Sequence, residues 1–207
     1  AGAVAWDITE QALSDCARLK QEGALEPIDY GVVSTDGIPA SLIDSEWVGL
    51  LTYSLVIGWQ AEKFGENGPQ SWADFWNTEA YPGTRAMFKS VSHALEAALM
   101  ADGVDPMDVN TILRSAGGVD RAFAKLQEIA PDITVWYRGG SQAAQLMADE
   151  EIDIIQIGNG RAEALNADST KVGFTWNQGT TDADCLLVPK GAPNRENAML
   201  VINEILS

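Results

Sequence analysis

The sequence predicts an α/β fold with mostly parallel strand pairing. Short apolar segments rich in Val, Ile and Trp alternate along the chain with segments whose apolar residues recur every three or four positions. Ser or Asn precedes several of these helical segments, and Gly or Pro follows them. Regular alternation of strands and helices is typical of parallel sheets, because each crossover between parallel strands needs a helix.

The first part of the chain predicts one strand and one helix. Residues 4–8 are expected to form a buried strand, and residues 9–21 a helix that Gly23 ends. Pro27 then predicts an extended connector, because proline keeps the preceding residue out of the helical conformation. Scattered Gly, Pro, Ser and Asp predict a loop over residues 31–45.

The middle of the chain has the clearest boundary signals. Residues 48–59 are a nearly continuous apolar run, which predicts one long buried strand. Ser71 is expected to cap a short helix, with Asp74 as its capping-box partner. Ser90 or Ser92 is expected to open a second helix. The expected buried residues of these two helices are Trp72, Phe75, Trp76, Leu95 and Leu99.

The last part of the chain continues the alternation. Helices are expected over residues 119–130 and 139–147. A short helix is expected to end at Leu165, and the last helix to run from an Asn194 cap to residue 206. The apolar stripe expected on the first of these is Val119, Phe123, Leu126 and Ile129. The expected strands are residues 133–137, 152–157, 172–176 and 185–188.

Composition narrows the class of protein. The chain has 207 residues, 46% of them apolar and 21% charged, which is enough to build a buried core. Its 13 Lys and Arg against 30 Asp and Glu give a net charge of −17. Nucleic acids and anionic membranes bind clustered positive charge, so this balance argues against both as partners. No apolar run is long enough to cross a bilayer, and no signal peptide is recognised.

The chain has two cysteines and one histidine. Cys16 and Cys185 are interpreted as buried free thiols, with a disulfide as the alternative. His93 is interpreted as a residue on a helix surface, and no motif supports a catalytic triad or a zinc site. The sequence therefore predicts no metal, no cofactor and no enzymatic chemistry.

Three charged residues, at two places in the chain, are candidates for ligand contact. Arg161 lies in a Gly-rich turn after a strand, at the kind of edge where α/β sheets bind ligands, and the alternative is a tight turn alone. Asp182 and Asp184 flank a predicted turn at residues 179–181 and precede the strand 185–188. A carboxylate there can hold an ammonium group, and the alternative is a solvated turn carboxylate.

Aromatic residues are the remaining candidates. Tyr53 and Trp176 are placed at a strand end or at a crossing between two parts of the chain, where an aromatic ring can form a wall for a cationic ligand. Packing in the core is the alternative for each of them.

Several segments together resemble one protein family. The order of these segments, rather than any one of them, is similar to the solute-binding proteins of spermidine/putrescine-type ABC transporters, and the resemblance covers nearly the whole chain. The segments are Trp6-Asp7-Ile8, residues 22–29, residues 69–103, residues 120–126, Trp136-Tyr137, residues 140–142, residues 159–161 and residues 188–194.

The resemblance implies a periplasmic-binding-protein-like fold of two lobes with the ligand between them. It implies a partial first lobe of residues 1–53 plus 183–207 and a nearly complete second lobe of residues 54–182, in a chain truncated at both ends. A lobe without its first strand is expected to expose a sheet edge, which predicts a dimer or larger species.

The resemblance also implies which residues meet the ligand. Asp184 matches the ammonium-binding aspartate of the polyamine branch, whereas Arg161 stands where one branch has an acidic residue, and Ser90 and His93 lie on a helix that carries acidic ligands there. One arginine with one aspartate suits a zwitterion better than a diamine. The predicted ligand-binding residues are Arg161, Asp184, Tyr53, Trp176, Asp182 and His93.

The function predicted is that of the substrate-binding component of an ABC importer, in the periplasm or outside the cell, for a polyamine or a small amine or amino-acid-like zwitterion. Its predicted protein partner is the transporter's membrane permease. The alternatives are a ligand sensor of the same fold and an α/β enzyme.

Overall fold

The computed structural model describes residues 4–207 and contains the predicted mixture of helices and strands. The strands are β1 (Thr9–Ala12), β2 (Trp47–Gln60), β3 (Arg85–Phe88), β4 (Ile133–Tyr137), β5 (Ile154–Gly158) and β6 (Val172–Leu187). The helices are α1 (Leu13–Gln21), α2 (Ala61–Phe64), α3 (Trp72–Trp76), α4 (Val91–Ala101), α5 (Val109–Arg114), α6 (Gly118–Ile129), α7 (Gly140–Ala148), α8 (Asn159–Ala167) and α9 (Arg195–Leu206). The α/β class predicted from the sequence is confirmed.

The chain folds as two units whose boundaries lie inside its two long strands. Unit 1 combines the chain up to Thr52 with Asp182–Ser207, and unit 2 is the continuous segment Tyr53–Thr181. The boundaries therefore fall within β2 and β6. The strand order is β1-β6-β2-β5-β3-β4.

Strand pairing is mixed, so the prediction of mostly parallel pairing is wrong. In unit 2, β3 pairs in parallel with both β4 and β5, whereas β5 runs antiparallel to β2. In unit 1, β1 runs antiparallel to β6. The helical crossovers explain the parallel pairs, and the long returning strands β2 and β6 supply antiparallel pairing that the alternation pattern does not reveal.

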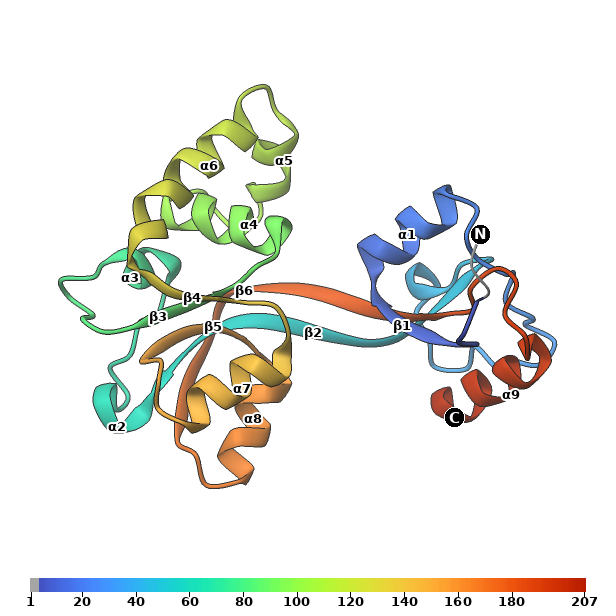
Figure 1. The fold of residues 1–207 in the computed structure, drawn as a ribbon. Helices are drawn as coiled ribbons and strands as arrows, with labels where there is room; N and C mark the ends of the chain where they lie inside the picture. Colours follow the sequence, from blue (N-terminus) through green and yellow to red (C-terminus); the bar gives the residue numbers. More distant parts are fainter. Residues whose placement is uncertain (1–3) are drawn as a thin grey trace. The chain divides into compact units, whose positions relative to one another are not determined.

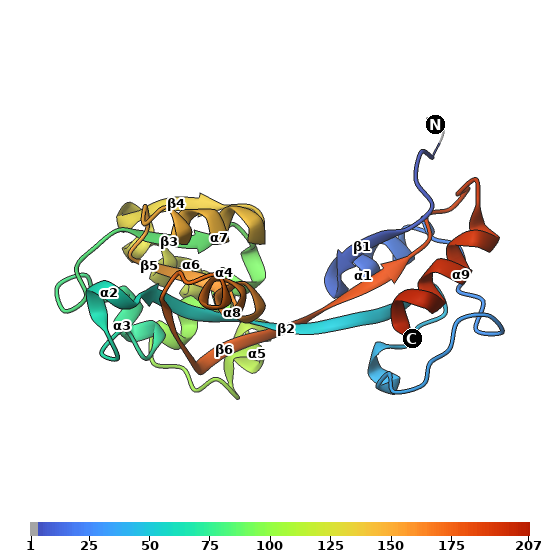
Figure 2. The same ribbon diagram turned by 90° about the horizontal axis from the view of Figure 1, so that it is seen from below.

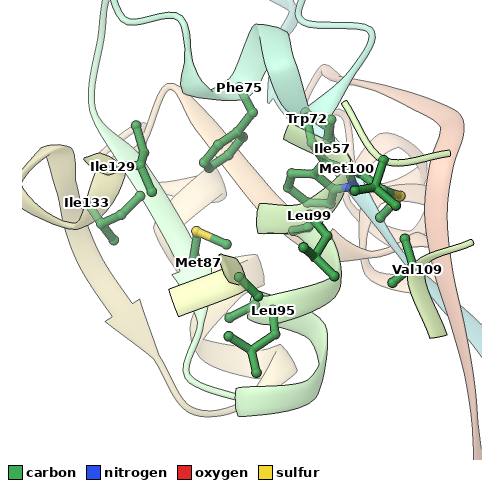
Figure 3. Packing of buried hydrophobic residues seen from close by; sticks show 14 of the residues in the cluster. Ile57, Trp72, Phe75, Met87, Leu95, Leu99, Met100, Val109, Ile129 and Ile133 are labelled. Atoms are coloured by element: carbon green, nitrogen blue, oxygen red, sulfur yellow. The ribbon is translucent and has the colours of Figure 1, made fainter. Parts of the chain in front are cut away.

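Helices cover both faces of the unit 2 sheet (Figure 1). Helices α3 to α6 pack on one face, where Trp72, Phe75 and Leu99 belong to the same buried cluster as Met87 of the sheet (Figure 3). Helices α7 and α8 pack on the other face through residues that include Leu146, Met147 and Leu165. The two faces explain why the strands of unit 2 are apolar on both sides.

Local capping fixes the start of α3. The Ser71 hydroxyl accepts a hydrogen bond from the Asp74 backbone N–H at 3.1 Å, and the Asp74 carboxylate accepts one from the Gln70 N–H at 3.0 Å. The predicted cap is confirmed, although the return bond goes to the residue before the cap. Trp72 also donates its Nε1–H to the Gln178 carbonyl at 2.9 Å, which ties α3 to β6.

A buried arginine closes the segment between α3 and β3. Arg85 is 1% exposed, and its guanidinium donates hydrogen bonds only to backbone carbonyl groups. These carbonyls belong to Phe75, Asn77, Tyr81 and Gly83. Burial lowers the pKa of Arg85 from its ordinary value, and the nearby charges of Asp132 and Asp153 oppose that shift. The arginine therefore satisfies carbonyls at the end of α3 and in the following turn.

In unit 1, α1 and α9 lie on opposite faces of the β1–β6 pair (Figures 1 and 2). Cys185 and Leu187 of β6 face α1, and Leu186 and Val188 face Met199 of α9. Cys16 of α1 is disulfide-bonded to Cys185, so the interpretation as free thiols is wrong. The sequence separation of 169 between the two cysteines concealed that β6 and α1 pack together.

Other differences concern element boundaries. Residues 4–8 do not form a strand, since the strand is β1 at residues 9–12, and Trp6 is 67% exposed. The predicted helix over residues 9–21 accordingly begins only at Leu13. On α6 the predicted stripe is only partly buried: Val119 and Phe123 are exposed, and Ala122 and Ile129 are buried.

The two strands predicted at residues 172–176 and 185–188 are one continuous strand, β6. The turn expected at residues 179–181 is therefore wrong. Thr180 is buried within the strand, and Gln178 has a φ of 59°, a left-handed conformation that polar residues adopt more readily than branched ones. A run of Asn, Gln, Gly and Thr looks like a turn in sequence because it lacks the usual apolar alternation.

Candidate ligand-binding site

The candidate residues of unit 1 form an acidic patch on the β1–β6 pair. Ala12 is opposite Asp184 and Glu10 is opposite Leu186 in the strand register. Directly opposite residues share a face, and faces alternate along each strand, so Glu10, Asp182 and Asp184 lie on the same face. Asp182 and Asp184 are thus residues inside β6 rather than at the start of a short strand.

The acidic patch changes the ionisation of Asp184. Burial, together with the charge of Glu10, a hydrogen bond to Glu10 and the charge of Asp182, raises the pKa of Asp184 to about 6. Removing water and adding like charges both penalise the ionised carboxylate. The side chain is therefore close to half protonated near pH 6, and a cation at this place favours its ionised form.

Glu10 was missed by the sequence analysis. It lies in the segment expected to be helical, where its side chain has no predicted relation to Asp184. Thr9 to Ala12 are four mostly polar residues without the alternation of apolar and polar positions that marks a strand, so the sequence gives no clear signal for β1.

Arg161 lies in unit 2, on the first turn of α8. The helix begins directly after β5, and this residue is exposed near the carboxyl end of the strand, as predicted. The Arg161 side chain lies close to Gly140, the first residue of α7. A Cβ atom added at Gly140 would be only 3.1 Å from the Arg161 Nε. Within residues 4–207, Arg161 forms no ion pair, so its charge is available to an anionic group.

The turn that carries Arg161 is tied to β2. The Asn159 side-chain oxygen accepts a hydrogen bond from the Ser54 backbone N–H at 2.9 Å. Ser54 and Thr181 share a further hydrogen bond between their hydroxyls, also 2.9 Å long. These contacts hold the start of α8 beside the two long strands.

The aromatic candidates also belong to unit 2. Trp176 is 59% exposed and packs edge-on against Phe174, with ring centroids 5.8 Å apart. It lies within β6 and not at a strand end. Tyr53 is partly buried and is the first residue of unit 2. Burial raises the pKa of the Tyr137 phenol, and the charge of the nearby Tyr53 adds to this shift.

His93 is buried, so the expectation of a helix-surface histidine is wrong. Its side chain is 5% exposed and lies at the start of α4. The Nδ1 atom is 3.2 Å from the Thr180 hydroxyl and 3.6 Å from the Glu96 carboxylate. These contacts place the imidazole between α4 and β6, where it holds the helix to the strand.

The structure thus groups Asp182 and Asp184 with Glu10 in unit 1, and places Arg161, Tyr53, Trp176 and His93 in unit 2. Among residues 4–207, no group of three or more His, Cys, Asp or Glu side chains has the arrangement needed to hold a metal ion. No helix in that range is long and apolar enough to span a membrane.

Comparison with known proteins identifies the family. Residues 1–207 match the family described as bacterial extracellular solute-binding protein. The chain belongs to this family. The resemblance noted in the sequence is thereby confirmed, and the family's members are extracellular or periplasmic solute-binding proteins.

Individual members of the family show which solutes similar chains bind. The gamma-aminobutyric acid-binding protein of Pseudomonas aeruginosa is 35% identical over 198 residues, which are 94% of this chain and 55% of that protein. The spermidine/putrescine-binding periplasmic protein of Escherichia coli is 22% identical, over 98% of this chain and 59% of that protein.

A solved structure of the family also matches the fold. The periplasmic binding protein MotA of Agrobacterium tumefaciens B6, determined in complex with glucopine, superposes with a TM-score of 0.92 at 35% identity. The match covers 98% of this chain and 62% of MotA. The chain thus spans between about half and two thirds of the length of these family members.

Proposed function

We propose that this solute-binding protein delivers a small amino-acid-like zwitterion, with an ammonium group and a carboxylate at opposite ends, to an ABC importer. The observation that carries the proposal is the division of charge: unit 1 presents the acidic patch around Asp184, and unit 2 presents an unpaired Arg161. The 35% identity to a gamma-aminobutyric acid-binding protein supports the same class of ligand.

The acidic patch suits the ammonium end. An ammonium group donates three hydrogen bonds, and carboxylates are its strongest acceptors. Asp184 is partly buried, so a bound ammonium loses part of its water there and the attraction between opposite charges becomes stronger than at an open surface.

Arg161 suits the carboxylate end. A guanidinium presents parallel N–H groups that match the two oxygens of a carboxylate. Its position on the first turn of α8 adds the favourable end of a helix dipole to its own charge. A diamine has no group for this site, which is the basis for preferring a zwitterion.

Aromatic side chains complete the proposal. Trp176 offers an exposed ring, and Tyr53 a partly buried one, for the methylene groups or the ammonium of the ligand. His93 is buried between α4 and β6, so we propose that it supports the site through Thr180 rather than through direct contact.

Binding of this kind involves no covalent chemistry. We propose that the protein, once loaded with its ligand, is recognised by the membrane permease, in the periplasm or outside the cell.

Calorimetric titration of this protein with gamma-aminobutyric acid and with putrescine tests the proposed function. Gamma-aminobutyric acid should bind, and Arg161→Ala should weaken it by more than thirtyfold while leaving putrescine unaffected or improved, since a broken desolvated ion pair costs about 2–5 kcal/mol. Asp184→Ala should weaken both ligands. Arg114→Ala and Asp36→Ala, which remove exposed charges elsewhere, are the matched controls.

Two results would overturn the proposal. If gamma-aminobutyric acid and related ω-amino acids do not bind, the ligand class is wrong. If Arg161→Ala binds the zwitterion as tightly as the wild type, Arg161 does not contact the carboxylate.

A further inference from the structure

We propose that the side-chain amide of Gln156 is a second donor to the carboxylate of the ligand, beside Arg161, at the carboxyl ends of β3 and β5 in unit 2. This inference rests on the proposed function, since it concerns the carboxylate end of the same zwitterion. It assigns a buried residue to a subsite for which the sequence indicates only the exposed Arg161.

The helices that follow β3 and β5 lie on opposite faces of the sheet. Helix α4 follows β3 and packs on the face covered by α3 to α6, whereas α8 follows β5 and packs with α7 on the other face (Figure 1). The strands β3 and β5 are neighbours and run parallel. Open α/β sheets bind ligands outside the carboxyl ends of two such strands, because the diverging connections leave that place uncovered.

The two strands stop pairing before they end. Their pairing ends at Ala86 and Ile155. Strand β3 nevertheless continues to Phe88, and β5 continues to Gly158. Gln156 is therefore the first residue of β5 beyond this pairing, and the polar groups of both strands need other partners here.

Side chains replace the missing bonds between the strands. The Gln156 Oε1 accepts a hydrogen bond from the Phe88 backbone N–H at 3.2 Å, and the Gln156 backbone carbonyl accepts one from the Tyr137 hydroxyl. The bond to Phe88 fixes the orientation of the amide, because the opposite orientation would set its NH2 group against another donor. Phe88 lies two residues beyond the last paired position and Gln156 only one, so the side chain reaches toward the carboxyl ends of the strands.

The amide nitrogen of Gln156 lacks an acceptor within the protein. The residue is 0% exposed, yet its Nε2 atom has no hydrogen-bond partner among residues 4–207. Buried donors in native proteins are almost always paired, because an unpaired donor keeps the full cost of losing its water. A ligand oxygen that enters from the carboxyl ends of the strands supplies the acceptor that this amide needs.

Gly158 leaves open space between this amide and Arg161. It lies two residues after Gln156 on β5, and therefore on the same side of the strand at a distance of about 7 Å. Around a Cβ atom added at Gly158, the Arg161 Cγ at 4.0 Å would be the one neighbour within contact distance among the described residues outside the adjoining chain. A ligand group can thus lie over Gly158 with Gln156 on one side and the stem of Arg161 on the other.

The two donors suit the two oxygens of one carboxylate. The guanidinium of Arg161 supplies the positive charge, and the primary amide of Gln156 supplies a neutral donor. An ammonium group has no acceptor, so a diamine at this end would leave the buried amide unpaired. Sites built to hydrogen-bond one group discriminate strongly against an analogue that lacks it. Gln156 is therefore a specificity-determining residue for the zwitterion.

Calorimetric titration of Gln156→Met with gamma-aminobutyric acid and with putrescine tests the inference. Methionine keeps the length of the side chain and cannot donate. The affinity for gamma-aminobutyric acid should fall about ten- to a hundredfold, as expected for a lost hydrogen bond to a charged group, and the affinity for putrescine should stay within about twofold. Gln127→Met, an exposed change on α6, is the matched control and should alter neither affinity.

Two further variants show whether Gln156 and Arg161 hold the same carboxylate. If they do, adding Gln156→Met to Arg161→Ala should lower the affinity for gamma-aminobutyric acid much less than Gln156→Met lowers it in the wild type, since residues that share a partner are not additive. Gln156→Glu keeps an acceptor for the Phe88 N–H but presents an acceptor to the ligand. At pH 8 it should weaken gamma-aminobutyric acid further and leave putrescine unaffected or improved.

NMR of the wild type observes the amide directly, even if a variant fails to fold. The side-chain NH2 signals of Gln156 should move, and exchange more slowly with water, when gamma-aminobutyric acid saturates the protein. Signals that do not respond to the bound ligand show that a water molecule occupies the amide, which overturns the inference.

The outcomes separate this inference from the proposed function. If gamma-aminobutyric acid binds and Gln156→Met leaves its affinity unchanged, or weakens both ligands equally, Gln156 does not contact the carboxylate and the proposed function stands. Fully additive effects of Gln156→Met and Arg161→Ala also overturn the shared carboxylate. Absence of gamma-aminobutyric acid and related ω-amino acids from the wild-type protein at saturating concentration overturns the proposed function and this inference with it.

Discussion

Cys16 of α1 is disulfide-bonded to Cys185 of β6. Cys185 directly follows Asp184, which belongs to the acidic patch. Both cysteines are completely buried, in a cluster with Leu25, Trp47 and Leu187. The bond therefore joins the helix and the strand that carry the core of this part of unit 1, across 169 residues of sequence.

Removal of this bond should destabilise unit 1. Replacing both cysteines by alanine should lower the free energy of unfolding by about 2–5 kcal/mol, because the unfolded chain regains the freedom that the long covalent loop denies it. Urea unfolding followed by circular dichroism measures the change. A reductant should shift the wild type in the same direction and leave the double variant unchanged; a wild type indifferent to reductant contradicts the prediction.

Arg85→Met should destabilise unit 2. The substitution keeps an apolar stem of similar length but leaves the carbonyls of Phe75, Asn77, Tyr81 and Gly83 without their shared donor. The expected loss is about 2–4 kcal/mol, since buried polar groups that lose a partner keep their desolvation cost. Thermal unfolding measures it against Arg114→Met, an exposed control. Equal stability of the two variants would show that the carbonyls find other donors.

Glu10→Gln should stabilise the protein at pH 7 more than at pH 4. The pKa of Asp184 is raised to about 6 in the folded state, so its contribution to stability is fully present below the ordinary aspartate value and is lost as the pH rises through 6. Removing Glu10 removes part of this loss. Urea midpoints at pH 4, 5, 6 and 7 test the prediction. A difference from the wild type that is the same at every pH would show that the effect is only structural.

The chain should also self-associate. Strand β1 is an edge strand with only four residues, and α9 exposes Leu200, Val201 and Ile205. An open edge and exposed apolar side chains in the same unit favour contact with a second copy. Light scattering coupled to size exclusion should show a dimer or larger species of this 207-residue chain. A monomer at high concentration contradicts the prediction, and Val201→Glu should weaken any dimer that forms.

Elements with their own local signals could be predicted from the sequence. The strand β4 has the predicted bounds, and the Ser71 cap and the start of α4 after Ser90 lie where the sequence places them. In each case the signal is a property of a few neighbouring residues: a capping side chain, a Gly or Pro stop, or a short β-branched run.

Features that depend on distant residues could not be predicted in this way. The disulfide needs the contact between α1 and β6, and the acidic patch needs the pairing of β1 with β6. Glu10 gains its relation to Asp184 only through that pairing. His93 was expected at a surface because its helix was predicted without the strand that covers it. Arg161 and Asp184 became candidates because Arg161 follows a strand and Asp184 resembles a family position, and their roles in binding stay predictions.

The discontinuity of unit 1 has a consequence for the order of folding during synthesis. All residues of unit 2 are contiguous, and its two ends are joined by the hydrogen bond between Ser54 and Thr181. Unit 2 can therefore complete its fold while the remainder of the chain is still being delivered, as contiguous domains do. Unit 1 must wait for β6 and α9, so Cys16 stays a free thiol until Cys185 arrives. An oxidant that acts before that moment can trap Cys16 with the wrong partner, which makes the timing of disulfide formation a determinant of yield.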